Sequence, residues 1–182
     1  MRRTSFWLKG LGALAILLAG CATEPQSASD RTQLHNDSLA ALNNVKQKDP
    51  SLSDFLSSAY GYALFPDIGK GAAGVGGAYG RGEVYEQNQR VGYTDMTQGT
   101  VGVALGGQEY SELLVFQNKW ALDQFKAGNF EFAAQVSAVA INSGAAASAK
   151  FQNGVAVFID VKGGLMGEAS IGGQKFTYQP NQ

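Results

Sequence analysis

Three basic residues beside a glycine-rich stretch are the side chains best placed to bind a ligand. Lys70 begins the stretch, Arg81 lies within it, and Arg90 follows the next turn. Successive backbone N–H groups of a glycine-rich segment can form a concave anion site, which nearby cations strengthen. The pattern favours a phosphate group as ligand. The alternative is three solvated surface charges, since Lys and Arg are usually exposed.

Small residues occupy alternate positions of the same stretch, namely Ala72, Gly74, Gly76, Ala78, Gly80 and Gly82. Because strand side chains alternate between two faces, one face there would carry almost no side chain. A bare face suits either close packing by another part of the protein or an open groove for an acyl chain. The dense packing of protein interiors favours the first interpretation.

Other motifs give weaker signals of catalysis or cofactor binding. Residues 69–74 have the spacing of a dinucleotide-binding loop, but the residues after them are poor helix formers, so the required helix N-terminus is missing. Residues 168–172 depart from the nucleophile elbow at its first glycine. The chain has one histidine, His35, and one cysteine, which is too few for a His/Cys metal site. We therefore predict no catalytic residue, no metal site and no cofactor.

Cys21 carries a different chemistry. A positive N-terminal region is followed by an apolar run at 11–18, which is too short to span a bilayer. The run ends in the sequence LAGC, which matches a bacterial lipobox, whose cysteine is lipidated and becomes the new N-terminus. An ordinary signal peptide with a chance cysteine is the alternative. We predict a lipoprotein signal peptide at 1–20, lipidation of Cys21, a polar tether at 21–30 and a single domain at 31–182.

The charge balance of the processed chain limits its partners. Removal of residues 1–20 takes away Arg2, Arg3 and Lys9, which leaves eleven basic against fifteen acidic residues and a formal charge of −4. This charge argues against nucleic-acid binding, which depends on clustered cationic residues. It also argues against attraction of the whole domain to anionic lipid, so an anionic ligand would need a local basic patch.

Hydrophobic periodicity predicts helices at 30–48, 52–59 and 118–126, with Asp30 and Asn118 as the candidate N-caps of the first and the last. Strands are predicted at 60–65, 72–84, 100–105, 112–116, 155–162 and 176–178, with 165–171 continuing as a strand. Residues 132–141 fit a strand, although their alanines also suit a helix. Turn signals lie at 66–67, 86–89, 106–107 and 163–164. We predict an α+β fold with a strongly curved, glycine-rich antiparallel sheet, a sandwich or part-closed barrel, packed by two or three short helices.

Several blocks of the chain resemble the SYLF domain family. They are GYALFP at 61–66, GKG at 69–71, the glycines of 74–82, Gly99, Gly102 and Gly106, GGL at 163–165, and Gly172-Gly173. The resemblance runs from about residue 52 to 178 and implies a lipid-binding module. Family members occur in bacterial lipoproteins and in eukaryotic proteins beside lipid-binding or actin-patch modules, and phosphoinositide binding is described in the eukaryotic relatives. Because this chain shows no partner domain and its N-terminal helix is not basic, the lipid class does not transfer.

We therefore expect a non-enzymatic, membrane-anchored lipoprotein that binds phospholipid or acyl chains at the periplasmic face of the cell envelope. Ala22, rather than Asp, follows the cysteine, which resembles outer-membrane sorting. The candidate lipid-binding residues are Lys70, Arg81, Arg90, Gly74, Gly76 and Gly80. A structural envelope lipoprotein whose sheet surface binds a protein partner is the alternative, and an unrecognised hydrolase is the third reading.

Overall fold

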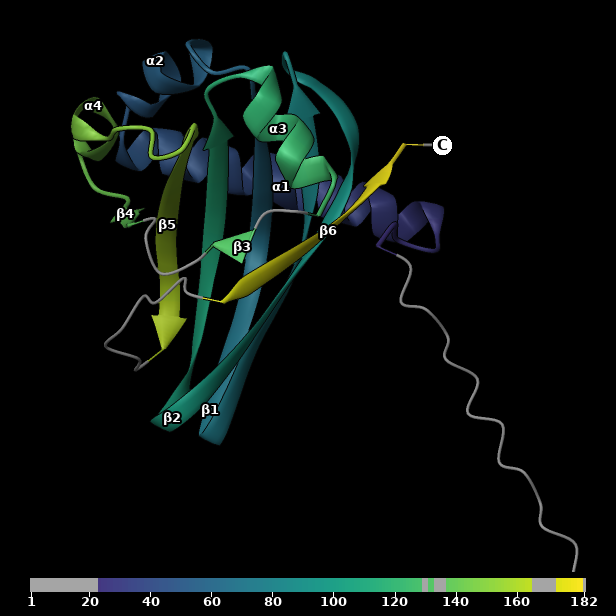
Figure 1. Ribbon diagram of the computed structural model, residues 1–182, viewed down its shortest axis with the longest axis vertical. Helices are drawn as coiled ribbons and strands as arrows, with labels where there is room; N and C mark the ends of the chain where they lie inside the picture. Colours follow the sequence, from purple (N-terminus) through teal and green to yellow (C-terminus); the bar gives the residue numbers. More distant parts are fainter. Residues whose placement is uncertain (1–22, 129–130, 133–136, 165–172, 182) are drawn as a thin grey trace, which may run out of the picture.

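A hairpin of two very long strands dominates the fold (Figure 1). The computed structural model describes residues 23–128, 131–132, 137–164 and 173–181, with the backbone alone at 72–75, 100–105, 131–132 and 164. Strand β1 spans Gly61–Glu86 and β2 spans Gln89–Phe116. Gln87 and Asn88 between them have φ values of 48° and 65°, as a two-residue hairpin turn with positive φ at both positions requires. The turn predicted at 86–89 is thus confirmed.

The turns predicted within these strands are wrong. β1 continues through Pro66-Asp67, where the register with β2 shifts between Phe65 and Ile68. A bulge adds a residue without ending a strand, and it tolerates the missing N–H of a proline. β2 likewise runs through Gly106-Gly107, and Gly163-Gly164 are the last two residues of the strand β5 (Val155–Gly164). The predicted strand at 165–171 lies outside the described residues.

Three further strands join β1, β2 and β5 in one mixed sheet. They are β3 (Glu131–Phe132), β4 (Ala138–Ala140) and β6 (Gln174–Pro180). Thus 132–141 is partly strand, although 133–136 lie outside the described residues. The strand order is β3-β6-β2-β5-β4 with β1 paired to β2, and only β4 and β5 pair in parallel.

The α+β class is confirmed, but the expected shape of the sheet is wrong. β2 pairs with β6 along 92–98 and with β5 along 108–116, so these strands extend the sheet rather than close it. The sheet is open and is not strongly curled as a whole, which excludes the sandwich and the part-closed barrel.

The sharp bending is confined to the hairpin. The Tyr60 carbonyl accepts a hydrogen bond from the Gln87 N–H at 3.0 Å, and the Tyr62 and Tyr85 rings stack with centroids 4.7 Å apart. Because these residues flank opposite ends of β1, the hairpin folds back on itself. Register shifts near residues 65–68, 73–75 and 84–85 mark bulges, which increase the local bend of a strand.

The fold-back explains part of the small-residue pattern. Gly80 and Gly82 are buried, whereas Tyr79, on the alternate parity just before them, is 48% exposed. A Cβ on Gly80 would lie 2.5 Å from Ile68 Cγ1, and one on Gly82 would overlap the Leu64 carbonyl oxygen. The prediction of close packing is therefore confirmed at these two glycines.

The pattern is not one continuous face. The register shift between Ala73 and Val75 interrupts the alternation of β1. Gly76 is half-buried, and at Gly74 only the backbone is described. The packed face thus begins beyond this shift.

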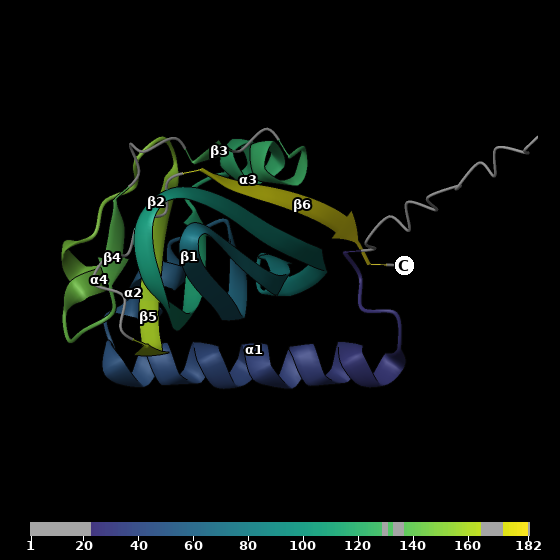
Figure 2. The ribbon, with the colours of Figure 1, turned by 90° about the horizontal axis from the view of Figure 1, so that it is seen from below.

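Four helices accompany the sheet. They are α1 (Ala28–Lys48), α2 (Leu52–Ser57), α3 (Lys119–Lys126) and α4 (Ala145–Ser148). The first three were predicted, although Ser27 rather than Asp30 caps α1, with its hydroxyl accepting from the Asp30 N–H at 3.0 Å. Asn118 caps α3 as predicted, accepting from the Ala121 N–H at 3.0 Å. Figure 2 shows α1 lying along one side of the sheet, with α3 on the other.

The short helix α4 was not predicted, because a distant residue holds it. The buried Asp49 carboxylate accepts hydrogen bonds from the Ala146 N–H at 2.6 Å, the Gly144 N–H at 3.2 Å and the Ser51 hydroxyl at 2.6 Å. Burial alone would raise the pKa of Asp49, but these hydrogen bonds together lower it. Asp49 thereby ties the start of α4 to the segment between α1 and α2.

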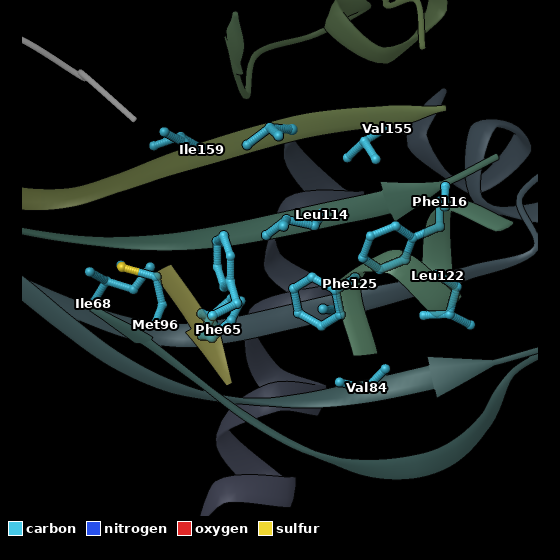
Figure 3. Close-up of a cluster of buried hydrophobic side chains, with 14 of the residues drawn as sticks. Phe65, Ile68, Val84, Met96, Leu114, Phe116, Leu122, Phe125, Val155 and Ile159 are labelled. Atoms are coloured by element: carbon cyan, nitrogen blue, oxygen red, sulfur yellow. The ribbon is translucent and has the colours of Figure 1, made fainter. Parts of the chain in front are cut away.

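Hydrophobic cores cover both faces of the sheet. The core beside α3 (Figure 3) contains Phe65, Ile68, Val84, Met96, Leu114, Phe116, Leu122, Phe125, Val155 and Ile159, among others. The core beneath α1, α2 and α4 includes Ala41, Val45, Leu52, Tyr62, Leu64, Tyr85, Leu113 and Phe158. Helix α1 is also held by polar contacts, since Asn44 and Lys48 each reach Asp160 at 2.7 Å.

Candidate functional site

A cleft with a glycine floor lies across the middle strands of the sheet. Its volume is about 730 Å³, and it is lined by Asp67, Gly69, Lys70, Gly107, Gln108, Glu109, Lys162 and Gly163. We call it the glycine cleft. β1, β2 and β5 each contribute a glycine, and Gly69 and Gly163 are both paired with Glu109 in the ladder. A Cβ on Gly69 or Gly163 would have nothing within 4 Å, so the space above the floor is open.

The charges around this cleft are of both signs. Lys162 forms an ion pair with Asp67, and Glu109 is exposed on the neighbouring strand. Lys70 is only 7% exposed, and its ammonium group forms no ion pair or hydrogen bond with any residue that the structure describes. A poorly solvated cation without a partner favours an anionic group brought by a ligand.

The other two predicted cations lie elsewhere, each against an acidic residue. Arg81 donates from Nε to Asp95 Oδ1 at 3.2 Å. Burial alone would lower the pKa of Arg81, but the Asp95 hydrogen bond raises it overall. Arg90 donates from Nη1 to Glu83 Oε1 at 2.6 Å. Neither arginine lines the glycine cleft, and neither is a solvated loop charge, since both lie in strands.

Of the six candidate lipid-binding residues, the structure therefore places Lys70 alone in the cleft. Gly80 packs against Ile68, which removes it from any open groove. Lys162, Gly107 and Gly163 line the cleft but were missed by the sequence analysis, since 106–107 and 163–164 were interpreted as turns. Two glycine pairs, Gly106-Gly107 and Gly163-Gly164, were the sequence signal that could have located the cleft.

A second pocket lies between α1 and the start of β2. It has a volume of about 320 Å³ and is lined by Ala28, Arg31, Thr32, His35, Arg90 and Tyr93. We call it the arginine pocket. Sequence analysis placed His35 in a polar helix and assigned it no ligand, yet this helix brings it to the pocket.

A fully buried acid, Glu83, lies behind the arginine pocket. Its Oε1 accepts from Arg90, and its Oε2 accepts from the Tyr85 hydroxyl at 2.6 Å and lies 3.1 Å from His35 Nδ1. Burial, followed by the hydrogen bond to Glu83, raises the pKa of Tyr85 well above its ordinary value. The hydroxyl therefore stays protonated and donates to Glu83.

A third polar feature lies inside the protein. Glu112 is 1% exposed, and its Oε2 accepts from Gln174 Nε2 at 2.9 Å. Its Oε1 has no hydrogen-bond partner among the described residues, and the same holds for Gln174 Oε1. Burial raises the pKa of Glu112 to about 7, although the Gln174 hydrogen bond opposes the change.

Two broader features were checked over the described part of the chain. None of the helices found there is both long and apolar enough to cross a membrane. Nor do three His, Cys, Asp or Glu side chains gather there as ligands for a metal ion.

An open sheet with a cleft and a pocket is an arrangement that suits a binding module. Comparison with known proteins points to the same class. Residues 97–181 match the Ysc84 family model, described as "Las17-binding protein actin regulator". The resemblance to the SYLF family is thus confirmed over residues 97–181, which match the Ysc84 (SYLF) domain family, a family of lipid-binding modules that are generally non-catalytic. Lys70, Arg81 and Arg90 precede the matched residues.

A curated relative extends the similarity towards the N-terminus. Beta cell expansion factor A of Aeromonas veronii is 28% identical over 156 residues, which cover 84% of this chain and 59% of the relative. The chain thus spans about three fifths of the length of this relative.

Proposed function

We propose that the protein is a non-enzymatic lipoprotein that binds phospholipid or acyl chains at the periplasmic face of the cell envelope. Lipidation of Cys21 anchors it in the membrane, and Ala22 directs it to the outer membrane. The match of residues 97–181 to a lipid-binding family supports this proposal. The lipobox motif and the apolar run before it support the anchor.

The observation that carries lipid binding is Lys70, which lines the glycine cleft and has no charged or hydrogen-bonding partner among the described residues. A lipid phosphate beside this ammonium group would supply the missing counter-charge, and the open glycine floor lets a headgroup approach the backbone closely. Glu109 is exposed at the same cleft and can accept hydrogen bonds from a cationic headgroup. The mixed charge of the residues that line the cleft therefore favours a zwitterionic phospholipid over a purely anionic one.

Vesicle flotation tests the headgroup site. Every sample is the full chain with Cys21→Ala, so that no covalent anchor floats it, and the vesicles contain phosphatidylethanolamine in phosphatidylcholine. Lys70→Gln should reduce the bound fraction severalfold, whereas Lys150→Gln, which removes an exposed lysine outside the cleft, should not. Thermal unfolding of both variants checks that the domain is intact. Equal flotation of the two variants would exclude Lys70 from the lipid site.

Mass spectrometry of the mature N-terminus tests the anchor separately. The native protein should begin at an acylated Cys21, and Cys21→Ala should remain unprocessed. A mature N-terminus without acyl mass would refute the anchor while leaving the cleft untouched.

Binding of a protein partner is the second candidate. Trp120 on α3 is 62% exposed, and tryptophan is enriched in protein interfaces. The family model's description also names a binding protein. Loss of one specific co-purifying protein in Trp120→Ala, with lipid binding unchanged, would favour this function.

A further inference from the structure

The arginine pocket combines positive charge with a fixed arrangement of donors. Arg31 and His35 come from the first half of α1, and Arg90 comes from the start of β2. Each of these side chains is partly exposed, at 36%, 40% and 32% respectively. None of the described residues that line the pocket carries a carboxylate, and Glu83 lies fully buried behind it. A small anion entering the pocket would therefore meet hydrogen-bond donors first.

Glu83 holds two of these side chains in position. It accepts from Arg90 Nη1 and contacts His35 Nδ1, while the Arg90 guanidinium also lies 5.2 Å from the Tyr93 ring centroid. An arginine fixed by a carboxylate and an aromatic ring loses less conformational entropy when it binds a ligand. Arg90 is thus pre-organised at the wall of the pocket.

Both arginines keep donors free. Among the described residues, Arg90 donates to a hydrogen-bond acceptor only through Nη1. Arg31 uses Nη1 as well, donating to the Pro25 carbonyl at 3.0 Å and lying 3.6 Å from Glu24 Oε1. The remaining guanidinium N–H groups can each donate, and two guanidinium forks match the oxygens of a tetrahedral oxyanion.

We infer that the arginine pocket binds a phosphate group, held by the free guanidinium N–H groups of Arg31 and Arg90 with His35 beside them. The volume of about 320 Å³ admits one phosphate with a small substituent rather than a whole lipid. The phosphate belongs either to a lipid headgroup or to a soluble phosphate compound. This site is separate from the glycine cleft and does not depend on the lipid bound there.

Titration of the full chain in detergent micelles with inorganic phosphate, followed by calorimetry, tests this inference. We expect millimolar or tighter binding, weakened at least about tenfold by Arg31→Gln. Lys46→Gln is the matched control, since it removes a positive charge from the same helix outside the pocket. Because Glu83 is buried, Arg90→Lys is preferred to a neutral variant: it keeps the charge, loses the fork and should weaken binding too.

The source of the phosphate is decided by a second arm of the experiment. Vesicles of phosphatidylcholine with phosphatidic acid are floated with the Cys21→Ala chain, with and without free phosphate. If free phosphate reduces flotation of the wild-type chain but not of Arg31→Gln, the pocket binds a lipid phosphate. If free phosphate has no effect on flotation while calorimetry still shows phosphate binding, the pocket binds a soluble phosphate compound.

Two results would overturn the inference: no phosphate binding by the wild-type chain in the millimolar range, or equal affinity in Arg31→Gln and Lys46→Gln. Lys70→Gln should leave the phosphate affinity unchanged, so failure of the glycine cleft and failure of the arginine pocket are distinguishable.

Discussion

Replacing Glu112 by Gln should change how the stability of the domain depends on pH. The carboxyl group is fully buried, with Phe65 and Ile159 as its neighbours on the adjacent strands and Tyr110 two residues away. No cation forms an ion pair with it in the described part of the chain, and burial raises its pKa to about 7. The folded protein therefore holds a proton on Glu112 that the unfolded chain, with a pKa near 4.5, has already released at pH 6.

The direction of the effect follows from this difference in proton binding. The contribution that protonated Glu112 makes to the stability of the folded domain is fully present below about pH 4.5 and is lost as the pH rises through about 7. A pKa change from 4.5 to about 7 corresponds to about 3 kcal/mol of unfolding free energy. Glu112→Gln removes the titration, and its amide keeps an oxygen that can accept from Gln174 Nε2.

Urea unfolding at pH 4.5, 6 and 8 measures this effect. Between pH 4.5 and pH 8, the free energy of unfolding of Glu112→Gln should rise by about 3 kcal/mol relative to that of the wild type. Glu109→Gln is the control, because this exposed carboxylate lies three residues away on the same strand and should follow the wild-type curve. A constant stability difference between wild type and Glu112→Gln across this range would refute the buried, protonated carboxyl group.

Two further predictions concern the fold. Gly82→Ala should destabilise the domain by about 1–3 kcal/mol, because its Cβ would overlap the Leu64 carbonyl oxygen. Gly99→Ala, whose Cβ would meet nothing within 4 Å, should stay within about 0.5 kcal/mol in the same urea titration; equal effects of the two variants would contradict the fold-back of β1. Asp49→Ala should cost roughly 2–4 kcal/mol at pH 7, because it leaves the N–H groups of Gly144 and Ala146 without their acceptor. Since the pKa of Asp49 is lowered, this cost should shrink as the pH falls below 3.8, and a pH-independent cost would argue against an ionised carboxylate.

Local pattern was sufficient for the elements whose causes are local. The helical spacing of α1 and α3, the Asn118 cap and the turn at 86–89 all depend on residues within a few positions of one another. The alternation of small residues also predicted the buried face correctly at Gly80 and Gly82. These are the features that side-chain periodicity and backbone preference determine directly.

Long-range contacts decided the rest. Pro66-Asp67 and Gly163-Gly164 carry turn chemistry, yet both pairs lie within strands because a neighbouring strand supplies ladder partners, with a bulge at the proline. Helix α4 depends on hydrogen bonds to Asp49, which no periodicity in 145–148 reveals. The shape of the sheet was mispredicted because β2 pairs with different strands at its two ends, which depends on register rather than on glycine content.

The candidate site was predicted in the same partial way. Lys70 was identified from its place beside the glycines, but its burial and its lack of a partner in the described part of the chain come from the tertiary fold. Arg81 and Arg90 were grouped with it by sequence distance, whereas Asp95 and Glu83 hold them at other places. Only the fold could distinguish the two arginines, which form ion pairs, from Lys70, for which the described residues offer no partner.

Native mass spectrometry of the full chain, extracted from the envelope in mild detergent, tests the central claim most directly. The account predicts a phospholipid that remains bound in addition to the covalent acyl mass on Cys21, and that is lost in Lys70→Gln but retained in Lys150→Gln. A wild-type spectrum with no bound lipid, or lipid retained equally by Lys70→Gln, would contradict a phospholipid site in the glycine cleft.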